Sequence, residues 1–218
     1  LKDASATAIY GSRGANGVII ITTKSGKKGT GKISYEGSSW VTSVAKKLDV
    51  LNLRQYAEHQ NALAGVFQVP TRAEFAFPEL LGNGTNWQDE VYQTAQVTSH
   101  NLSFSGGKDG TSYYMSGGYI NQEGIIIGSG YKRYTARVNV DSRVKDWLKV
   151  GANVNAGISN ERITVNQSYV GLISNTLLQA PDIPVRTLSG DFAAPPAGQN
   201  VAYFNPVAEA LIKDNKLI

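Results

Sequence analysis

The stretch Tyr131–Arg143 reads YKRYTARVNVDSR and alternates between two kinds of side chain. From Tyr134 to Val140 every second residue is apolar, and the residues between them are polar or charged. Because successive side chains of a β-strand point to opposite faces, the pattern predicts a strand with one apolar and one polar face. The next stretch, Trp147–Ser159 (WLKVGANVNAGIS), repeats the alternation and predicts a second strand of the same kind.

These two strands favour a membrane barrel. In outer-membrane barrels the apolar side of each long strand meets lipid, and the polar side lines a wet lumen. A soluble sandwich alternates as well, so one strand alone does not decide between the two. We expect the lumen-facing side chains to be Arg133, Arg137, Asn139, Asp141, Lys149, Asn153 and Asn155. We expect the lipid-facing side chains to be Tyr134, Val138, Val140, Leu148, Val150, Val154 and Ile158.

The connections between strands agree with this interpretation. The same period predicts strands at about 31–44, 97–107, 112–121, 131–143 and 147–159. Asp109-Gly110 predicts a type I′ hairpin turn, and a second short turn falls around Lys145-Asp146. The other links, at about 46–95, 121–130 and 160–218, are longer, and short helices are expected within them at Asn52, Asn86 and Asn205-Pro206. Tight turns at one end and loops at the other are typical of outer-membrane barrels.

The composition excludes several kinds of site. The 218 residues include no cysteine, which excludes disulfides, thiolate metal sites and cysteine nucleophiles. His59 and His100 are the only histidines, and their spacing is not that of a metal site. The net charge is +4, and aromatic residues do not interleave with the basic cluster at 24–32, so we expect no nucleic-acid partner. We likewise expect no cofactor and no metal.

A glycine-rich turn, Gly26–Ile33 (GKKGTGKI), raises the question of phosphate binding. It follows an apolar strand, as a P-loop does, but is one residue short of that motif. Ile33 stands where a hydroxyl would bind Mg²⁺, and the following residues have strand period rather than helix period. A nucleotide-binding protein is therefore the least favoured alternative, and since no catalytic constellation is found elsewhere, we expect no enzyme.

The opening stretch LKDASATAIYGSRGANGVIIITTKSGKKG (Leu1–Gly29) closely resembles the end of the plug domain in SusC/RagA-type TonB-dependent outer-membrane receptors of Bacteroidetes. Further similar motifs follow in order along the rest of the chain. They are TNWQDEVYQTA (85–95), NLSFSGG (101–107), SGGYINQEGI (116–125), YKRYTARVNVD (131–141) and NPVA (205–208).

The resemblance implies a fold. Residues 1–30 would be the C-terminal end of an α+β plug domain, and residues 31–218 the N-terminal part of the barrel. The fold class is then mostly β: a partial antiparallel transmembrane β-barrel of about five strands, with short helices in long extracellular loops. The loops would be 46–95, 121–130 and 160–218. Five strands do not close a membrane barrel, which needs about 8, so we expect the chain to be a fragment of a larger protein.

The resemblance also implies a function. Members of this family import oligosaccharides or peptides across the bacterial outer membrane, together with a SusD-like surface lipoprotein and with energy from the TonB complex. By analogy Arg13, Asn16, Trp87 and Tyr92 are candidate substrate contacts, although plug architecture and loop packing explain the same residues. The alternative from another class is a soluble β-rich carbohydrate-binding or adhesin module. The sequence does not identify the nutrient, for which a glycan is the favoured class.

Overall fold

The computed structural model describes Gly11, Val18 and Ile19, and then residues 29–164, 171–194, 205–212 and 216–217. Nearly all of the predicted plug segment, including Arg13 and Asn16, lies outside the described residues. The glycine-rich turn is described only from Gly29 onward.

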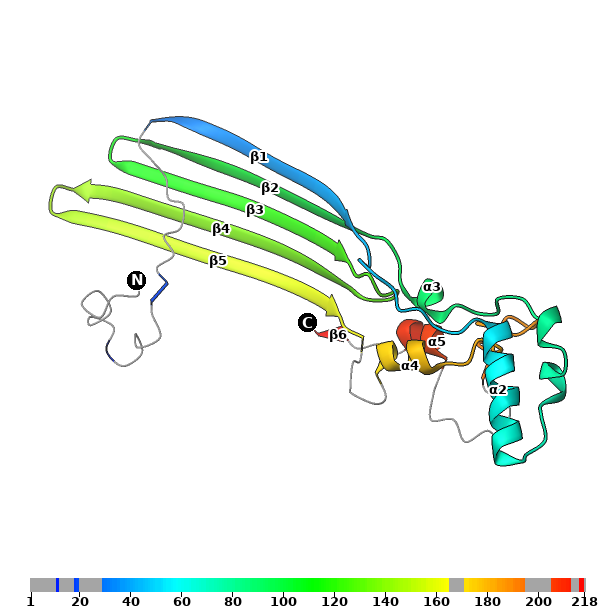
Figure 1. The fold of residues 1–218 in the computed structure, drawn as a ribbon. Helices are drawn as coiled ribbons and strands as arrows, with labels where there is room; N and C mark the ends of the chain where they lie inside the picture. Colours follow the sequence, from blue (N-terminus) through cyan, green and yellow to red (C-terminus); the bar gives the residue numbers. More distant parts are fainter. Residues whose placement is uncertain are drawn as a thin grey trace. The chain divides into compact units, whose positions relative to one another are not determined.

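The strands form one sheet in which each strand neighbours the next along the chain (Figure 1). The five long strands are antiparallel, and with the few helices they confirm the predicted fold class. A sixth strand of two residues was not predicted, because Lys216-Leu217 is too short to show a period. It pairs with the end of the fifth strand through Glu161 and Arg162. The strands are β1 (Gly29–Thr42), β2 (Ala95–Lys108), β3 (Thr111–Glu123), β4 (Gly130–Lys145), β5 (Leu148–Arg162) and β6 (Lys216–Leu217).

The two predicted tight turns join the long strands. Asp109 and Gly110 have φ angles of 50° and 84°, which is the left-handed pair that a type I′ turn requires. Only Asp146 and Trp147 separate β4 from β5. At this turn β4 continues two residues beyond its predicted end, to Lys145, whereas β5 begins one residue later than predicted and extends at its other end to Arg162.

Two compact units divide the chain. The first comprises Leu1–Ser34, Leu102–Ser116 and Ala136–Asn155, and includes both tight turns. The second comprises Tyr35–Asn101, Gly117–Thr135 and Ala156–Ile218, and includes all the described helices.

Three helices of the second unit, α2, α3 and α5, begin at residues whose side chains cap them. Asn52 and Gln55 form a capping box at the start of α2. Asn86 caps α3, and Asn205 caps α5 by accepting hydrogen bonds from the backbone of Val207 and Ala208. None of the described helices is long and apolar enough to cross a membrane. The helices are α2 (Leu53–Phe67), η2 (Ala73–Phe75), η3 (Pro78–Leu80), α3 (Trp87–Val91), α4 (Leu172–Leu178) and α5 (Pro206–Ile212).

All three long connections contribute to one hydrophobic core in the second unit. The connection from β1 to β2 supplies Trp87 and Val91, and the connection from β3 to β4 supplies Ile126. The segment after β5 supplies the rest: Leu172, Ile183, Ala193, Val207 and Ala210. Main-chain hydrogen bonds join the first two connections, from Gln93 N to Ile125 O at 2.8 Å and from Ile127 N to Val91 O at 3.0 Å. The three predicted loops therefore pack together as one unit, which we call the loop body, around a shared core.

Candidate functional site

A polar pocket lies beside α3 in the second unit. Its volume is about 720 Å³, within the range of about 300–1,000 Å³ that is usual for ligand pockets. Apolar side chains form part of the wall, and the rest is amide and carboxylate. The lining residues are Val50, Leu51, Asn52, Asn83, Gly84, Thr85, Asn86, Asp89, Glu90, Pro184 and Val185.

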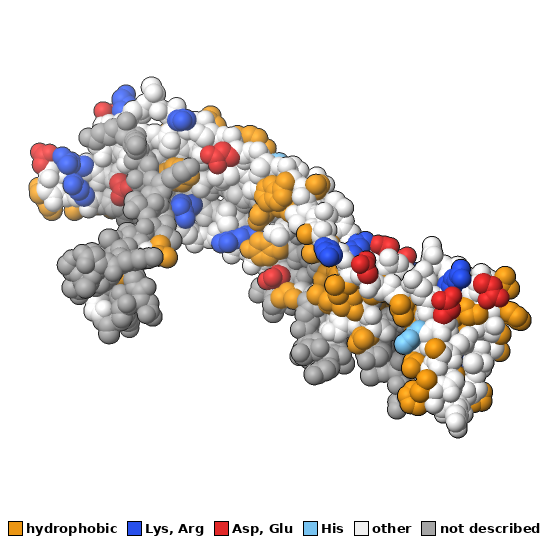
Figure 2. All heavy atoms as spheres, in the orientation of Figure 1, with side chains coloured by type: hydrophobic (Ala, Val, Ile, Leu, Met, Phe, Trp, Pro, Cys, Tyr) orange, Lys and Arg blue, Asp and Glu red, His pale blue; other side chains and the backbone are white. Residues whose placement is uncertain are grey.

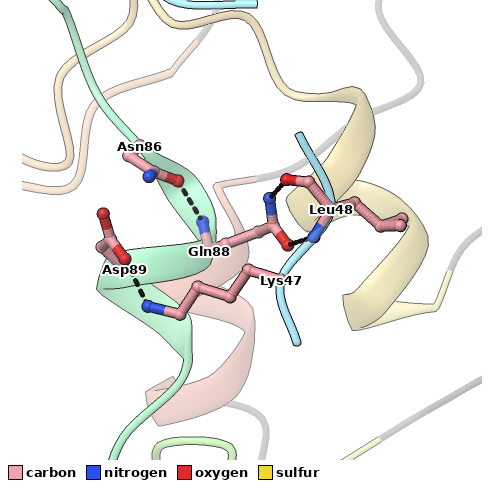
Figure 3. Close-up of polar contacts among 5 residues, drawn as sticks. All are labelled: Lys47, Leu48, Asn86, Gln88 and Asp89. Carbon is pink, nitrogen blue, oxygen red and sulfur yellow. Dashed lines mark hydrogen bonds and ion pairs between the residues drawn. The ribbon is translucent and has the colours of Figure 1, made fainter. Parts of the chain in front are cut away.

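Gln88 fixes one wall of this pocket to α3 (Figure 3). Its side chain is only 3% exposed. The amide accepts a hydrogen bond from Leu48 N at 2.9 Å and donates one to Leu48 O at 2.7 Å. Beside it, Asp89 pairs with Lys47, and Asn86 Oδ1 accepts from Gln88 N at 3.2 Å. The segment leading to Val50–Asn52 is thereby positioned against α3.

Another part of the wall is held by backbone and hydroxyl groups around Thr85. Its N–H donates to Pro181 O at 2.9 Å, and its hydroxyl donates to Ile183 O at 2.8 Å. The preceding Gly84 has a φ of +69°, and a Cβ there would collide with the Pro181 carbonyl. A glycine is required at this position both by the left-handed backbone and by the close approach of the second chain segment.

The pocket offers donors and acceptors of hydrogen bonds. Asn52 and Asn86 use their Oδ1 atoms in helix caps, so their Nδ2 groups are the donors they can present to a ligand. Asp89 and Glu90 supply carboxylate acceptors. Such a set suits the hydroxyl groups of a sugar or the amide groups of a peptide. Among the described residues no group of three or more His, Asp or Glu side chains could hold a metal ion.

Elsewhere in the second unit a largely buried ion pair links the start of η2 to the segment after α4. Arg72 contacts Asp182 at 2.8 Å, and its guanidinium lies 4.2 Å above the ring of Phe75. The Phe75 ring packs edge-on against Tyr56 of α2, with 5.9 Å between centroids. Burial, and then the negative charge of Asp182, raise the pKa of the Tyr56 hydroxyl above its ordinary value.

The structure places the two described substrate-contact candidates in or against the core. Trp87 is 2% exposed, packs among core side chains and donates from Nε1 to Ala180 O at 3.0 Å. Its indole therefore packs the loops together in this structure, and a role in substrate contact stays a prediction. Tyr92 is partly buried against the same core, and its backbone pairs with Ile126. The residues that line the pocket were not predicted as site residues from the sequence, although the helix cap predicted at Asn86 is one of them.

The predicted polar face of β4 and β5 forms a hydrogen-bonded row in the first unit. Arg137 Nε donates to Asn155 Oδ1 at 2.6 Å, and Asn155 Nδ2 donates to Asn153 Oδ1 at 2.8 Å. On the same strands Asp141 lies against Gly151, where a Cβ would be 2.7 Å from its Oδ1. Asn139 is buried, and Arg133 and Lys149 are exposed. The structure thus brings together three of the candidates, and that this face lines a lumen stays a prediction.

The predicted apolar face is open. Five of its side chains are 37–70% exposed: Tyr134, Val138, Val150, Val154 and Ile158. Val140 and Leu148 are partly buried. Contiguous exposed apolar side chains of this kind mark surfaces that are covered by lipid or by a partner.

A row of four aromatic rings crosses β1, β2, β3 and β4 within the second unit. Tyr35 and His100 are 6.1 Å apart between ring centroids, His100 and Tyr119 are 6.4 Å apart, and Tyr119 and Tyr134 are 4.9 Å apart. Tyr35 Oη also lies 2.7 Å from His100 Nδ1. The row was not predicted, because it becomes visible only when the register of four strands is known. Aromatic rows of this kind form the girdles of membrane barrels.

Comparison with known proteins gives the class to which these features belong. The chain is 36% identical over 217 residues to the TonB-dependent receptor P3 of Formosa agariphila, which covers 96% of the chain and 20% of that receptor. It is 44% identical over 163 residues to the TonB-dependent receptor SusC of Bacteroides thetaiotaomicron, which covers 73% of the chain and 15% of that receptor. No family model matches the chain.

Solved structures agree with the sequence matches. The RagAB peptide transporter superposes with a TM-score of 0.69 at 31% identity, over 88% of this chain and 25% of that one. The closed-closed state of the RagAB peptide importer gives a TM-score of 0.68 at 30% identity. The chain belongs with the TonB-dependent receptors. Within them it is of the SusC and RagA type, which confirms the resemblance found in the sequence. It spans 15–20% of the length of the two curated relatives named here.

Proposed function

We propose that this chain forms part of a TonB-dependent outer-membrane transporter that imports large nutrients, with oligosaccharides or peptides as cargo and without bond chemistry. Residues 31–218 supply the first strands and loops of its barrel, and residues 1–30 the end of its plug. The observation that carries the proposal is the aromatic row on an open apolar face, together with relatives that are TonB-dependent receptors.

In this proposal the two faces of the strands have different roles. The face bearing Arg137, Asn153 and Asn155 lines the lumen, where a hydrogen-bonded polar row tolerates water and polar cargo. The face bearing Val138, Val154 and Ile158 meets lipid, since these side chains are exposed in the described part of the chain. The tight turns are periplasmic, and the packed loop body is extracellular.

The loop body is the part that meets cargo and partner. The pocket beside α3 supplies amide donors and carboxylate acceptors for a polar cargo. Exposed hydrophobic side chains gather on the segment α2–η3 (Figure 2), and they include Val66, Phe67, Val69, Phe77 and Leu80. An apolar surface of this kind supports contact with a protein partner, for which the SusD-like lipoprotein is our proposal. Energy from the TonB complex belongs to the same proposal.

Different observations favour each of the two cargo classes, oligosaccharides and peptides. The family resemblance in the sequence favours an oligosaccharide, whose hydroxyl groups the donors and acceptors of the pocket can bind. The match to a peptide importer favours a peptide. Binding of maltooligosaccharides and of mixed oligopeptides to the purified full-length protein, followed by isothermal titration calorimetry, separates them. The Glu90→Gln variant should weaken the class that uses the pocket, with wild-type protein in the same titration as reference.

Cysteine labelling in native membranes tests the proposal directly. These 218 residues contain no cysteine, and any cysteine elsewhere in the full-length protein is replaced first. Arg137→Cys and Val138→Cys place single thiols on adjacent residues of β4 that face opposite ways. A water-soluble maleimide should label the first thiol through the lumen, and a lipid-soluble reagent should label the second. Aqueous labelling of Val138→Cys with lipid labelling of Arg137→Cys would refute the register and the barrel. A protein recovered in the soluble fraction would favour the binding or adhesin module instead.

A further inference from the structure

A second polar pocket lies at the loop ends of β3, β4 and β5, within the second unit. Its volume is about 360 Å³. Five side chains of its lining carry the argument: Asn121, Glu123, Lys132, Asn160 and Arg162. The pocket is separate from the one beside α3, with which it shares no lining residue.

The strand period places these side chains on the face of the aromatic row. Lys132 lies two residues before Tyr134 on β4, and Asn121 lies two residues after Tyr119 on β3. Since every second side chain of a strand points to the same face, both share the face of those rings. On β5 the same count from Ile158 gives Asn160 and then Arg162.

The pocket therefore lies two residues beyond the aromatic row along each strand, on the face that meets lipid in the proposed function. This inference rests on that proposed function. Aromatic girdles mark the boundary between hydrocarbon and head groups. A step of two residues along a strand is about 7 Å, which carries a side chain from that boundary into the head-group layer. Because the pocket is at the loop ends, the relevant layer is that of the outer leaflet.

The charges of the pocket favour an anion. Lys132 and Arg162 are cationic, and Glu123 is the single carboxylate among the lining residues. Glu123 Oε2 accepts a hydrogen bond from Gln96 N at 3.4 Å, so this oxygen is directed toward the Gln96 backbone. Arg162 donates from Nη2 to Leu211 O at 2.9 Å, a contact that fixes its guanidinium at the pocket wall. Lysine and arginine bind phosphate through charge-assisted hydrogen bonds.

We propose that this pocket binds a phosphate group on the saccharide head of an outer-leaflet lipid. Lys132 is the principal cation for the phosphate, and Arg162 adds a second positive charge. The amides of Asn121 and Asn160 donate to or accept from the neighbouring hydroxyl groups of the saccharide. Such a lipid would remain attached to the first strands and cover the polar pocket where it borders the membrane.

The test uses the full-length protein in lipid nanodiscs that contain either phosphorylated or dephosphorylated lipid A, with bound lipid counted by native mass spectrometry. Lys132→Gln should weaken retention of phosphorylated lipid A by about tenfold, the effect of losing one charged hydrogen bond, and leave the dephosphorylated lipid unchanged. Lys132→Arg should restore retention. The matched control, Lys149→Gln, makes the same charge change on the opposite face of β5 and should leave retention unchanged.

Equal retention by wild type and Lys132→Gln would overturn the inference. It would also be overturned if inorganic phosphate bound the detergent-solubilised protein with the same dependence on Lys132 while the lipid did not, since the ligand would then be a soluble anion. The labelling of Arg137→Cys and Val138→Cys reports on the proposed function separately. With labelling as expected and retention unchanged, the lipid site alone fails.

Discussion

Replacing Gln88 by leucine should free the segment before the α3 pocket. The variant keeps a side chain of similar size in a position that is 3% exposed, but removes both hydrogen bonds to the Leu48 backbone. Each such bond contributes about 0.5–1.5 kcal/mol net. Leu48 itself is 60% exposed, so water can replace part of what is lost. Together the two bonds contribute about 1–3 kcal/mol, and we expect the loss of local stability to fall in the lower half of this range, about 1–2 kcal/mol.

Hydrogen exchange of the Leu48 amide in the full-length protein measures this loss. A change of about 1–2 kcal/mol corresponds to exchange about 5–30-fold faster, provided that the amide exchanges by local opening. Gln88→Glu retains the acceptor for Leu48 N–H but not the donor, and should give a smaller increase.

The control is Asp89→Asn, which breaks the neighbouring pair with Lys47. The side chains of that pair are 42% and 55% exposed, so its contribution is at most about 1 kcal/mol. Unchanged exchange at Leu48 in Gln88→Leu, or an equal increase in Asp89→Asn, would refute the argument that Gln88 holds this wall.

Three further predictions concern the loop body. Trp87→Ala should lower the unfolding free energy of the loop body by about 3–5 kcal/mol, and Trp87→Phe should lower it by clearly less. Thermal denaturation followed by near-UV circular dichroism would show the difference, and similar values for the two variants would contradict the packing role. Gly128→Ala should destabilise by more than about 1 kcal/mol, because Gly128 has a φ of +75° and its Cβ would collide with the Ala210 carbonyl. Gly65→Ala in α2, where a Cβ meets nothing within 4 Å, should instead stabilise by about 0.5–1 kcal/mol. Chemical denaturation of both glycine variants beside wild type would measure these changes, and equal stability of the two variants would contradict the argument. Folding raises the pKa of the Tyr56 hydroxyl and so favours its neutral form. The stability that this contributes to the folded loop body is present below about pH 10 and is lost as the pH rises through the folded pKa. Tyr56→Phe should flatten this alkaline decline in a series of denaturation experiments at increasing pH, and an unchanged profile would exclude Tyr56 as its cause.

The long strands could be predicted from sequence because each carries its own information. Period-two alternation in Tyr131–Arg143 fixes which side chains share a face, and Asp109-Gly110 specifies its turn without reference to the rest of the chain. Helix starts at Asn52, Asn86 and Asn205 were predictable for the same reason, since a cap is a local feature.

What was not predictable depends on distant pairing. The aromatic row joins Tyr35 to Tyr134 through two other strands, and the short strand β6 is defined only by its partner β5. Burial of Trp87 likewise depends on a carbonyl 93 positions away. The pocket beside α3 joins residues near 50, 85 and 185, which no local pattern relates to one another.

The shared core of the long connections has a consequence for how such receptors diversify. Trp87, Ile126 and Val207 come from three different connections and pack in one cluster. An exchange of one connection with that of a relative would therefore leave cavities or clashes in the other two. Chimaeras in which 46–95, 121–130 and 160–218 are transferred together should therefore fold where single-loop grafts do not. Under the proposed function, cargo preference in this part of the molecule is then inherited as a block.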